Sequence, residues 1–406
     1  MRATRSKPKQ AMRNRSISDK YAYACLLAII IAGLSIAAYF YSGPYYQFDD
    51  GQYIVYARQI IAGNFSMTQD PHAFGYLMPS LVAASFVAFG AGPLTAILPS
   101  LVEYVIIIIL AFLIGRELFS KEAGLAASFL IIITPTIFGY ATRVLPDMLI
   151  GMLAGVALYV FVIGIKGGKK STATILASGF IFGMIIFVKI GGAMVILPAL
   201  IGVVLFYREH AARFTAGMAA SLVLYFASFY VLSGGQLSLL SEYSSTQAAL
   251  VPHGTLLINF ITMLDMVAGP VEIYQVYPIG LTLLLAFVGT YLAFKRRDLR
   301  LQYIAFIFWF VFFYLFYGTE SLAQYTFITA VNRYLIAVSI PMALLAGYVL
   351  ADVYSTCGMI GGKRLAVFVL IVLILLTIVS NVPAYADLYS FKAYILGMPV
   401  PPNFYG

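Results

Sequence analysis

Two adjacent carboxylates, Asp49 and Asp50, stand shortly after the first long apolar stretch of the chain. Apolar side chains recur at helical spacing over residues 52–61, which places the pair at the start of a short helix. Aspartate is favoured there because its side chain accepts hydrogen bonds from free backbone N–H groups. Capping explains one aspartate and not two, so a structural and a functional interpretation both stand.

A second polar element lies between two later apolar stretches, where Arg143 precedes Asp147 by one helical turn. Pro146 fits the first position of the helix that contains Asp147. The two charges could form a purely structural ion pair close to the lipid. They could equally join Asp49 and Asp50, since carboxylates that meet isolated cations suit a site for a phosphate, a divalent metal or both.

The same segments contain side chains that could bind a metal. Asp49, Asp70, His72 and Asp147 are the candidate ligands, and His253 is a further histidine. Carboxylate oxygens alone suit Mg²⁺ or Mn²⁺, and histidine nitrogen is a ligand of Zn²⁺. Isolated histidines are more often ordinary loop residues, so the sequence leaves a divalent metal open.

The composition is that of a protein with many membrane spans. Hydrophobic residues make up 62% of the chain and charged residues 10%, whereas a soluble domain has about a quarter charged residues. The two cysteines, Cys25 and Cys357, form neither a disulfide framework nor a metal-binding pattern. Basic residues flank the apolar stretches instead of forming a patch with aromatic residues, so the net charge of +9 indicates topology and not nucleic-acid binding.

Eleven stretches have about the length and apolar character that a spanning helix needs, roughly 20 residues. We read the first as a retained span and not a cleaved signal peptide, because no small-residue cleavage site follows it. The predicted spans are 21–41, 93–115, 122–140, 147–165, 172–188, 191–207, 212–232, 276–294, 301–318, 332–352 and 364–381.

The basic residues orient these spans. Twenty of the 25 Lys and Arg fall into six clusters between the apolar stretches, and positive residues in short loops stay cytoplasmic. The N-terminus is therefore predicted to be cytoplasmic. The other five basic residues should lie on the extracytoplasmic side or inside the bilayer, where a positive charge needs a reason. These five are Arg58, Arg143, Lys189, Arg333 and Lys392.

This topology divides the chain into a basic cytoplasmic segment (1–20), a transmembrane catalytic module (21–232) with a first outer loop (42–92), a second outer loop (233–275), and C-terminal spans with a short outer tail (276–406). Residues 73–90 are apolar but short and contain Pro79, so we expect them to lie along the outer interface or to re-enter the membrane from that side. The second loop is long enough to suggest a lid over the site.

Several short motifs follow one another over residues 48–161. Their order identifies a family more specifically than any single motif does. An acidic pair is followed by a Tyr and an Ala on one helix, a second acidic residue by an aromatic segment ending in Phe-Gly, and a Leu-Pro-Ser helix by an Arg-x-x-x-Asp element. In this order the chain resembles the GT-C membrane glycosyltransferases that use polyprenyl-phosphate sugars, in the branch of the protein O-mannosyltransferases and the lipid A aminoarabinose transferase. The matching residues are Asp49, Asp50, Tyr53, Ala57, 70–76, 89–90, 98–100, 115–119, 134–135, Arg143, Asp147, 332–334 and Pro341.

The resemblance implies an all-α polytopic GT-C fold. The predicted spans give it about 11 transmembrane helices and leave no large soluble domain, in which the chain departs from those relatives that have one. It implies a multi-pass enzyme of the cell membrane that moves a sugar, with inversion, from a polyprenyl (dolichyl or undecaprenyl) phosphate to an acceptor hydroxyl on the extracytoplasmic face. The expected partners are this lipid-linked donor, membrane lipid, and a protein, lipid or glycan acceptor.

The resemblance also assigns roles to residues. Asp49 is the expected base and Asp50 its support, while Asp70 and Asp147, with His72 nearby, shape the acceptor or metal region. Arg143 and Arg333 are expected to bind phosphate, because the guanidinium fork matches phosphate oxygens. Arg58 and Lys189 are secondary candidates for the same role.

Two other classes of protein remain possible from the sequence. A transporter or flippase for lipid-linked sugars would also carry charges in its spans, such as Glu103 and Lys189. Transporters usually show paired repeats and helices broken near the midplane, and no repeat is visible here. A non-enzymatic factor that binds polyprenyl phosphate is the third reading. Lys189 itself could simply extend its charge to the membrane surface from a tight turn.

Overall fold

The computed structural model describes residues 17–41, 49–67, 70–167, 171–236, 238, 281–317, 331–360 and 362–382. Every regular element in these ranges is a helix. The first half contains α2 (Asp19–Tyr39), α3 (Asp49–Ile61), α4 (Pro71–Phe74), α5 (Leu77–Phe89), α6 (Pro93–Leu118), α7 (Lys121–Ile133), α8 (Pro135–Phe138) and α9 (Pro146–Lys166). The second half contains α10 (Thr172–Met184), η2 (Ile185–Phe187), η3 (Ile190–Gly192), α11 (Ala193–Phe206), α12 (Arg208–Leu232), α15 (Leu281–Lys295), α16 (Leu299–Tyr317), α17 (Val331–Tyr334), η4 (Leu335–Val338), α18 (Ser339–Ile360) and α19 (Gly362–Ser380).

In the part of the chain that the structure describes, each of the eleven ranges predicted to span the membrane contains a helix. Five helical segments of the described residues are long and apolar enough to do so: α2, α6, α9, α12 and residues 335–359. The others are shorter apolar helices, so the count of about 11 spans stays a prediction. The range 122–140 is divided into α7 and α8 at Thr134, because Pro135 disfavours the helical conformation of the residue before it.

Small residues allow several helices of the bundle to approach closely. A Cβ atom on Gly179 of α10 would lie 2.0 Å from the carbonyl oxygen of Phe214 on α12, and one on Gly217 of α12 would lie 2.0 Å from that of Leu176. Gly115 of α6 packs in the same way on Gly124 of α7. Such contacts are the usual basis of helix association in membranes, where burial of apolar side chains gives no net drive.

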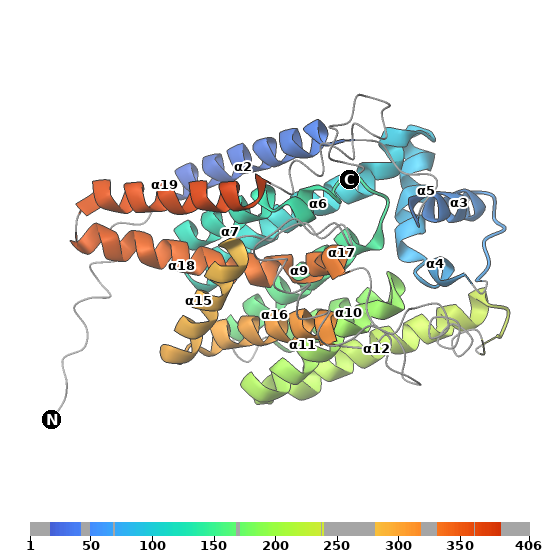
Figure 1. Ribbon diagram of the computed structural model, residues 1–406. Helices are drawn as coiled ribbons and strands as arrows, with labels where there is room; N and C mark the ends of the chain where they lie inside the picture. The colour runs from blue at the N-terminus through green and yellow to red at the C-terminus, as the bar shows by residue number, and fades with distance from the viewer. Residues whose placement is uncertain are drawn as a thin grey trace.

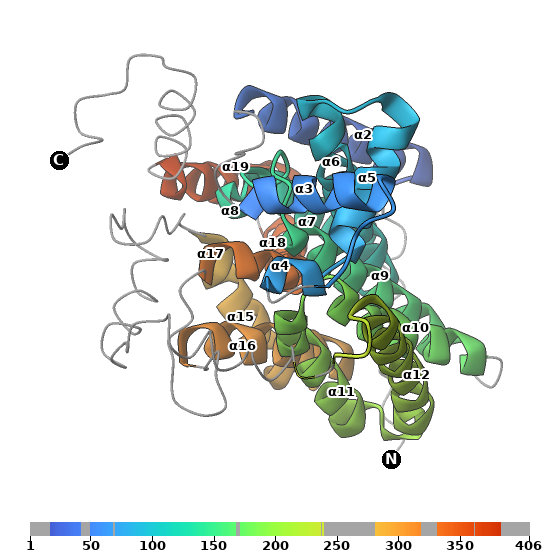
Figure 2. The ribbon, with the colours of Figure 1, turned by 90° about the vertical axis from the view of Figure 1, so that its right-hand side faces the viewer.

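The long helices run roughly side by side, and short helices gather at one end of the bundle (Figure 1). Seen from that end, α3 and α4 run across it, close to α5, α8 and α17 (Figure 2). We call it the α3 end. The turns that join α11 to α12, α15 to α16 and α18 to α19 lie at the opposite end (Figure 1). α5 has 13 residues, fewer than the roughly 20 that a spanning helix needs.

Two sets of contacts fix the α3 end to the bundle. One face of α3, with buried Tyr53, Ile54 and Ala57, packs on α5 and belongs to the main core. A second cluster joins Phe74 of α4, Phe187 of η2 and Phe229 of α12. The residues of the predicted first outer loop are thus held against both sides of the bundle.

Candidate functional site

Asp50 fixes the start of α3 to the turn before α9. Its side chain is fully buried and accepts hydrogen bonds from Arg143 Nε at 3.1 Å and Nη2 at 2.5 Å. The backbone N–H of Val144 donates to the same carboxylate at 2.7 Å. Because Asp147 follows on the first turn of α9, this connection sets where α3 sits relative to Asp147.

Asp49, the other member of the pair, takes part in a different set of contacts. Its Oδ2 lies 2.6 Å from Arg333 Nη1 on α17, and its side chain is 35% exposed. Arg333 Nε lies 3.9 Å from Asp147 Oδ2. One guanidinium therefore stands between the carboxylates of α3 and α9, and Asp49 is the partly open member.

Asp147 is buried at the same place. Its residue is 1% exposed, and neither carboxylate oxygen has a hydrogen-bond partner among the described residues. The buried Tyr53 lies in the electrostatic range of Asp147, Arg333 and Asp49, and burial raises the pKa of its hydroxyl well above the usual value. Arg333 Nε at 3.9 Å gives this carboxylate an ion pair but no hydrogen bond. A buried polar group without a hydrogen bond costs free energy, so this position suits contact with a hydroxyl or a cation of a bound ligand.

His72 connects Asp49 to Asp70. Its Nδ1 lies 2.6 Å from Asp70 Oδ1 and its Nε2 3.5 Å from Asp49 Oδ1. Although burial opposes the charged form, the two carboxylates raise the pKa of His72 to about 9. The hydrogen bond from His72, together with Arg333, keeps the pKa of Asp49 well below its usual value.

Asp70 has a structural place of its own. Partial burial alone would raise its pKa, but hydrogen bonds from His72 and from the hydroxyl of Tyr56 at 2.7 Å lower it to about 2. Asp70 also caps α4, accepting from the backbone N–H of His72 at 2.9 Å. It therefore holds His72 from both the ring and the backbone.

A second cation lies beside Arg333. Lys189 stands between η2 and η3, and its Nζ donates to the hydroxyl of Tyr334 at 2.9 Å, with the ring centroid 4.2 Å away. The guanidinium of Arg333 lies 5.5 Å from the same ring centroid. Tyr334 thus brings two cations from distant parts of the chain to one place, as a phosphate group would require.

Close packing keeps Lys189 next to α4. A Cβ atom on Gly75, the residue that follows α4, would lie only 1.9 Å from the carbonyl oxygen of Val188. Glycine is therefore required here by the contact between the two backbones. The contact ties the segment that holds Asp70 and His72 to the turn that holds Lys189.

The structure brings together most of the residues that the sequence singled out. Asp49, Asp70, His72, Asp147, Arg333 and Lys189 form one connected group, and Asp50 with Arg143 lies beside it. Arg143 forms its ion pair with Asp50, a partner that the simple pairing of Arg143 with Asp147 did not include. Arg58 is exposed nine residues along α3, about 13 Å from Asp49 along the helix axis. His253 and most of the predicted lid, 233–275, lie outside the described residues.

Sequence reasoning did not assign a role to Tyr56 or Tyr334. Tyr334 was part of the Asn-Arg-Tyr motif, and its position next to Arg333 was the available signal. Tyr56 lies three residues after Tyr53, and only the fold shows that its hydroxyl donates a hydrogen bond to Asp70.

The fit of a metal to this site can be judged from the side chains present. The described residues contain no group of three or more His, Cys, Asp or Glu arranged to hold a metal ion. Both nitrogens of His72 face carboxylates, and Arg333 occupies the space between Asp49 and Asp147. As arranged, these side chains do not fit a metal.

Comparison with known proteins matches part of the chain to one family model. The family model described as dolichyl-phosphate-mannose-protein mannosyltransferase matches residues 73–233. No curated protein matches the sequence. The matched segment runs from within α4 to just past the end of α12 and contains Arg143, Asp147 and Lys189, whereas Asp49, Asp70, His72 and Arg333 lie outside it.

Solved structures match almost the whole chain. The oligosaccharyltransferase of Archaeoglobus fulgidus in its apo form aligns with a TM-score of 0.59 and 16% identity over 95% of this chain. ArnT from Cupriavidus metallidurans bound to undecaprenyl phosphate aligns with a TM-score of 0.62 and 15% identity over 91% of this chain and 76% of that one. The present chain spans 57% of the archaeal enzyme.

These findings confirm the resemblance predicted from the sequence. The chain is a multi-pass membrane protein that shares the fold of these solved structures. The family model over residues 73–233 is one of protein mannosyltransferases, the branch named from the sequence. At this level of identity the solved structures establish the fold alone.

Proposed function

We propose that the protein transfers a sugar from a polyprenyl phosphate to an acceptor hydroxyl at the α3 end. The observation that carries the proposal is the contact between Asp49 and Arg333, with Lys189 close by on Tyr334. A partly exposed carboxylate and two cations then stand within one site, the combination that displacement of a phosphate by a hydroxyl needs. ArnT has been solved with undecaprenyl phosphate, and the archaeal oligosaccharyltransferase with dolichol-phosphate and an inhibitory peptide.

The reaction follows from these groups. The acceptor oxygen attacks the anomeric carbon, the bond from that carbon to the phosphate oxygen breaks, and the acceptor proton passes to Asp49. Asp49 is ionised but weakly basic, because His72 and Arg333 lower its pKa. It can take the proton late, once the new bond has made the hydroxyl acidic. A single displacement inverts the anomeric carbon, and no enzyme nucleophile is needed.

Arg333 and Lys189 are the proposed phosphate ligands. Arg333 uses Nη1 for Asp49, and its Nε has no hydrogen-bond partner among the described residues. As the sugar leaves, negative charge grows on the phosphate, and preorganised cations stabilise it. Arg143 is committed to Asp50 by two nitrogens, so we propose that it positions α3 and does not bind phosphate.

The remaining assignments are also proposals. The site would face the extracytoplasmic side with the N-terminus in the cytoplasm, since the described residues of the basic clusters, such as Lys166 and Arg296, lie at the opposite end of the bundle (Figure 1). The acceptor would be a protein, lipid or glycan hydroxyl, oriented by Asp147 and Asp70. A divalent metal would require Arg333 or His72 to move; the archaeal enzyme has been solved with Zn and sulfate.

The test is sugar transfer by the purified protein in lipid nanodiscs. Dolichyl- and undecaprenyl-phosphate sugars are supplied with membrane extract as acceptor, and release of polyprenyl phosphate is measured with and without EDTA. Asp49→Asn should lower release by about 10²–10⁴-fold, the typical contribution of a general base. Asp19→Asn, at the other end of the bundle, is the matched control.

The outcomes separate the functional classes. Release that depends on Asp49 supports the transferase. Tight donor binding with no release from any donor would favour a flippase or a binding factor instead. Loss of release on adding EDTA, restored by one metal, would show that a cation belongs to the working site.

A further inference from the structure

The end of the bundle opposite to α3 contains a hollow that the proposed reaction does not use. Its volume is about 600 Å³, and it lies where the C-terminal end of α9 and the turns between α11 and α12 and between α15 and α16 meet. We propose that it binds the phosphate headgroup of an anionic membrane lipid whose chain lies along α16. This inference is independent of the transferase proposal.

Charge is the first argument. Four basic side chains line the hollow against two acidic ones, Glu209 and Asp298. The basic residues are Lys166, Arg296, Arg297 and Arg300. They come from two sequence clusters that are more than 100 residues apart. The fold therefore gathers the positive charge in one place, beyond the charges that simply flank each spanning helix. Basic pockets between spanning helices are typical binding sites of anionic headgroups.

The basic residues differ in how far they are already paired. Arg296 makes a two-bond ion pair with Asp352 at 2.8 and 2.9 Å, and Lys166 contacts Glu117 at 2.8 Å. Arg297 joins no ion pair among the residues that the structure describes. Arg300 contacts Asp298 through two nitrogens, at 3.2 and 3.3 Å. All three ion pairs are partly exposed, and such pairs are weak. Arg297, which is exposed, is therefore free to hold a phosphate, and Arg300 can exchange Asp298 for the same phosphate.

Arg297 also occupies a backbone position that favours glycine. Its φ is +53°, the one positive φ of a non-glycine residue among the described residues. It follows α15, where its N–H donates to the carbonyl of Phe294 at 3.2 Å. Glycine is the common residue at such a helix end. A substitution by glycine removes the charge at this position without disturbing the turn.

The start of α12 adds to the attraction for an anion. α12 begins at Arg208 without a side-chain cap, and the hollow is lined by residues of its first turn, including His210. His210 Nδ1 is buried and has no hydrogen-bond partner among the described residues. The N-terminus of a long helix carries partial positive charge.

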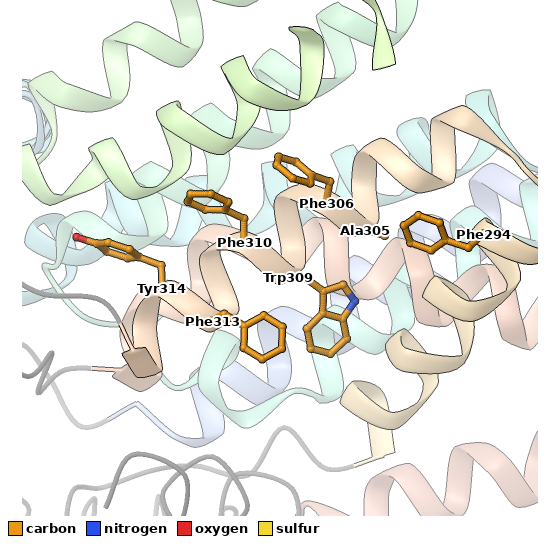
Figure 3. Close-up of a pocket in the computed structure, with 7 residues that line it drawn as sticks. All are labelled: Phe294, Ala305, Phe306, Trp309, Phe310, Phe313 and Tyr314. Carbon is orange, nitrogen blue, oxygen red and sulfur yellow. The ribbon is translucent and has the colours of Figure 1, made fainter. Parts of the chain in front are cut away.

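An aromatic groove on α16 supplies a place for the lipid chain. Five aromatic side chains of α16, from Phe306 to Tyr314, and Phe294 of α15 line a second hollow of about 600 Å³ (Figure 3). Phe306 lies about 9 Å along the helix axis from Arg300, at 1.5 Å per residue. One lipid could therefore place its phosphate at Arg297 and Arg300 and its chain on Phe306 and Phe310. A soluble phosphate would leave the groove unused.

The experiment is lipid binding to the purified full chain, followed by native mass spectrometry in detergent. Phosphatidylglycerol is titrated against phosphatidylcholine for the natural protein and for Arg297→Gly combined with Arg300→Gln. Arg213→Gln, which removes an exposed charge on α12 outside the hollow, is the matched control. Loss of two surface cations should weaken phosphatidylglycerol binding about tenfold or more, with the control unchanged and phosphatidylcholine weak throughout.

A second measurement separates the source of the phosphate. Phosphatidylglycerol should raise the melting temperature of the natural protein, and millimolar inorganic phosphate should not. Equal phosphatidylglycerol affinity in the double variant and the natural protein would overturn the proposal. Equal stabilisation by inorganic phosphate alone would also overturn it, since the occupant would then be a soluble anion.

Discussion

Arg333 Nη1 lies 2.6 Å from Asp49 Oδ2, although the two residues are 284 positions apart in the chain. The same guanidinium reaches towards Asp147, with Nε 3.9 Å from Oδ2. Among the described residues, Arg333 is thus the only side chain that forms ion pairs with both Asp49 and Asp147. It is also a proposed ligand of the leaving phosphate. It also keeps Asp49 ionised by lowering its pKa, behind the larger contribution of His72.

Replacing Arg333 with lysine should lower sugar transfer by about 10²-fold, the usual loss when one preorganised donor is removed from a transition-state site. Lysine keeps the charge but has a single donor group, which cannot serve Asp49, Asp147 and a phosphate in the fixed geometry of a fork. Donor turnover in nanodiscs is the measurement. Arg213→Lys, on exposed surface at the other end, is the control, and equal losses in both variants would contradict the assignment.

Asp50 and Arg143 should act as a stability pair and not as catalytic groups. Asp50 is fully buried, so removing either partner leaves an uncompensated charge at a cost of about 3–5 kcal/mol. The losses in Asp50→Asn and Arg143→Met should therefore not add in the double variant. The measurement is the free energy of unfolding by denaturant in mixed micelles, compared with Asp49→Asn. Additive losses would show that the pair is not coupled.

Lys189 and Tyr334 should govern the affinity for the donor. Tyr334→Phe keeps the ring beneath Lys189 but removes the hydroxyl that Nζ contacts at 2.9 Å, and its effect should be smaller than that of Lys189→Met. Lys189→Met removes a cation from the phosphate, so the dissociation constant should rise about tenfold or more, the equivalent of one charge-assisted hydrogen bond. Binding of the lipid-linked donor is measured directly. A donor affinity that is unaffected in Lys189→Met would remove Lys189 from the site.

Gly75→Ala should damage both stability and transfer, because the new Cβ would lie 1.9 Å from the carbonyl oxygen of Val188. The backbone segments would have to separate, and α4 with His72 would move away from Lys189. Gly92→Ala is a matched control in the same region, since its Cβ would meet only Thr95 Oγ1 at 3.7 Å. Melting temperature and turnover are measured together. Wild-type values for Gly75→Ala would show that the contact is not required.

Glu103 should be replaceable with a gain in stability. It is 2% exposed within α6, and both carboxylate oxygens lack a partner among the described residues. Glu103→Met should raise the free energy of unfolding by about 1–3 kcal/mol, the cost of a buried unsatisfied polar group. In Glu117→Met the same change removes an ion pair with Lys166 and Arg116, so no gain is expected. A loss of transfer in Glu103→Met without a loss of stability would instead assign Glu103 to function.

The sequence was a good guide to the helices because apolar stretches in a membrane must form them. Ranges predicted as spans coincide with helices from α2 to α19. The division between α7 and α8 at Thr134 left one sign in the sequence, Pro135 within an apolar stretch. Whether a helix ends or continues at such a proline depends on tertiary packing. The placement of Gly75 against Val188 had no local signal, because the contact joins segments more than 100 residues apart.

The roles within the acidic pair show where sequence reasoning stopped. Spacing and family resemblance singled out Asp49 and Asp50 together. Consecutive residues of a helix point about 100° apart, so the two side chains must meet different neighbours. Only the fold shows which neighbours these are. Asp50 points into the bundle at Arg143, and Asp49 points towards Arg333 and His72.

The sequence by itself determined that this is a multi-pass helical membrane protein. It also determined which charged residues stand apart from the basic clusters and which fold the chain resembles. These properties are set by composition and by the order of short motifs. The tertiary structure decided which carboxylate meets which cation, because pairing depends on distances between helices that the chain does not encode locally. It also gathered basic residues from two distant clusters around one hollow, which linear charge patterns could not distinguish from ordinary cytoplasmic turns.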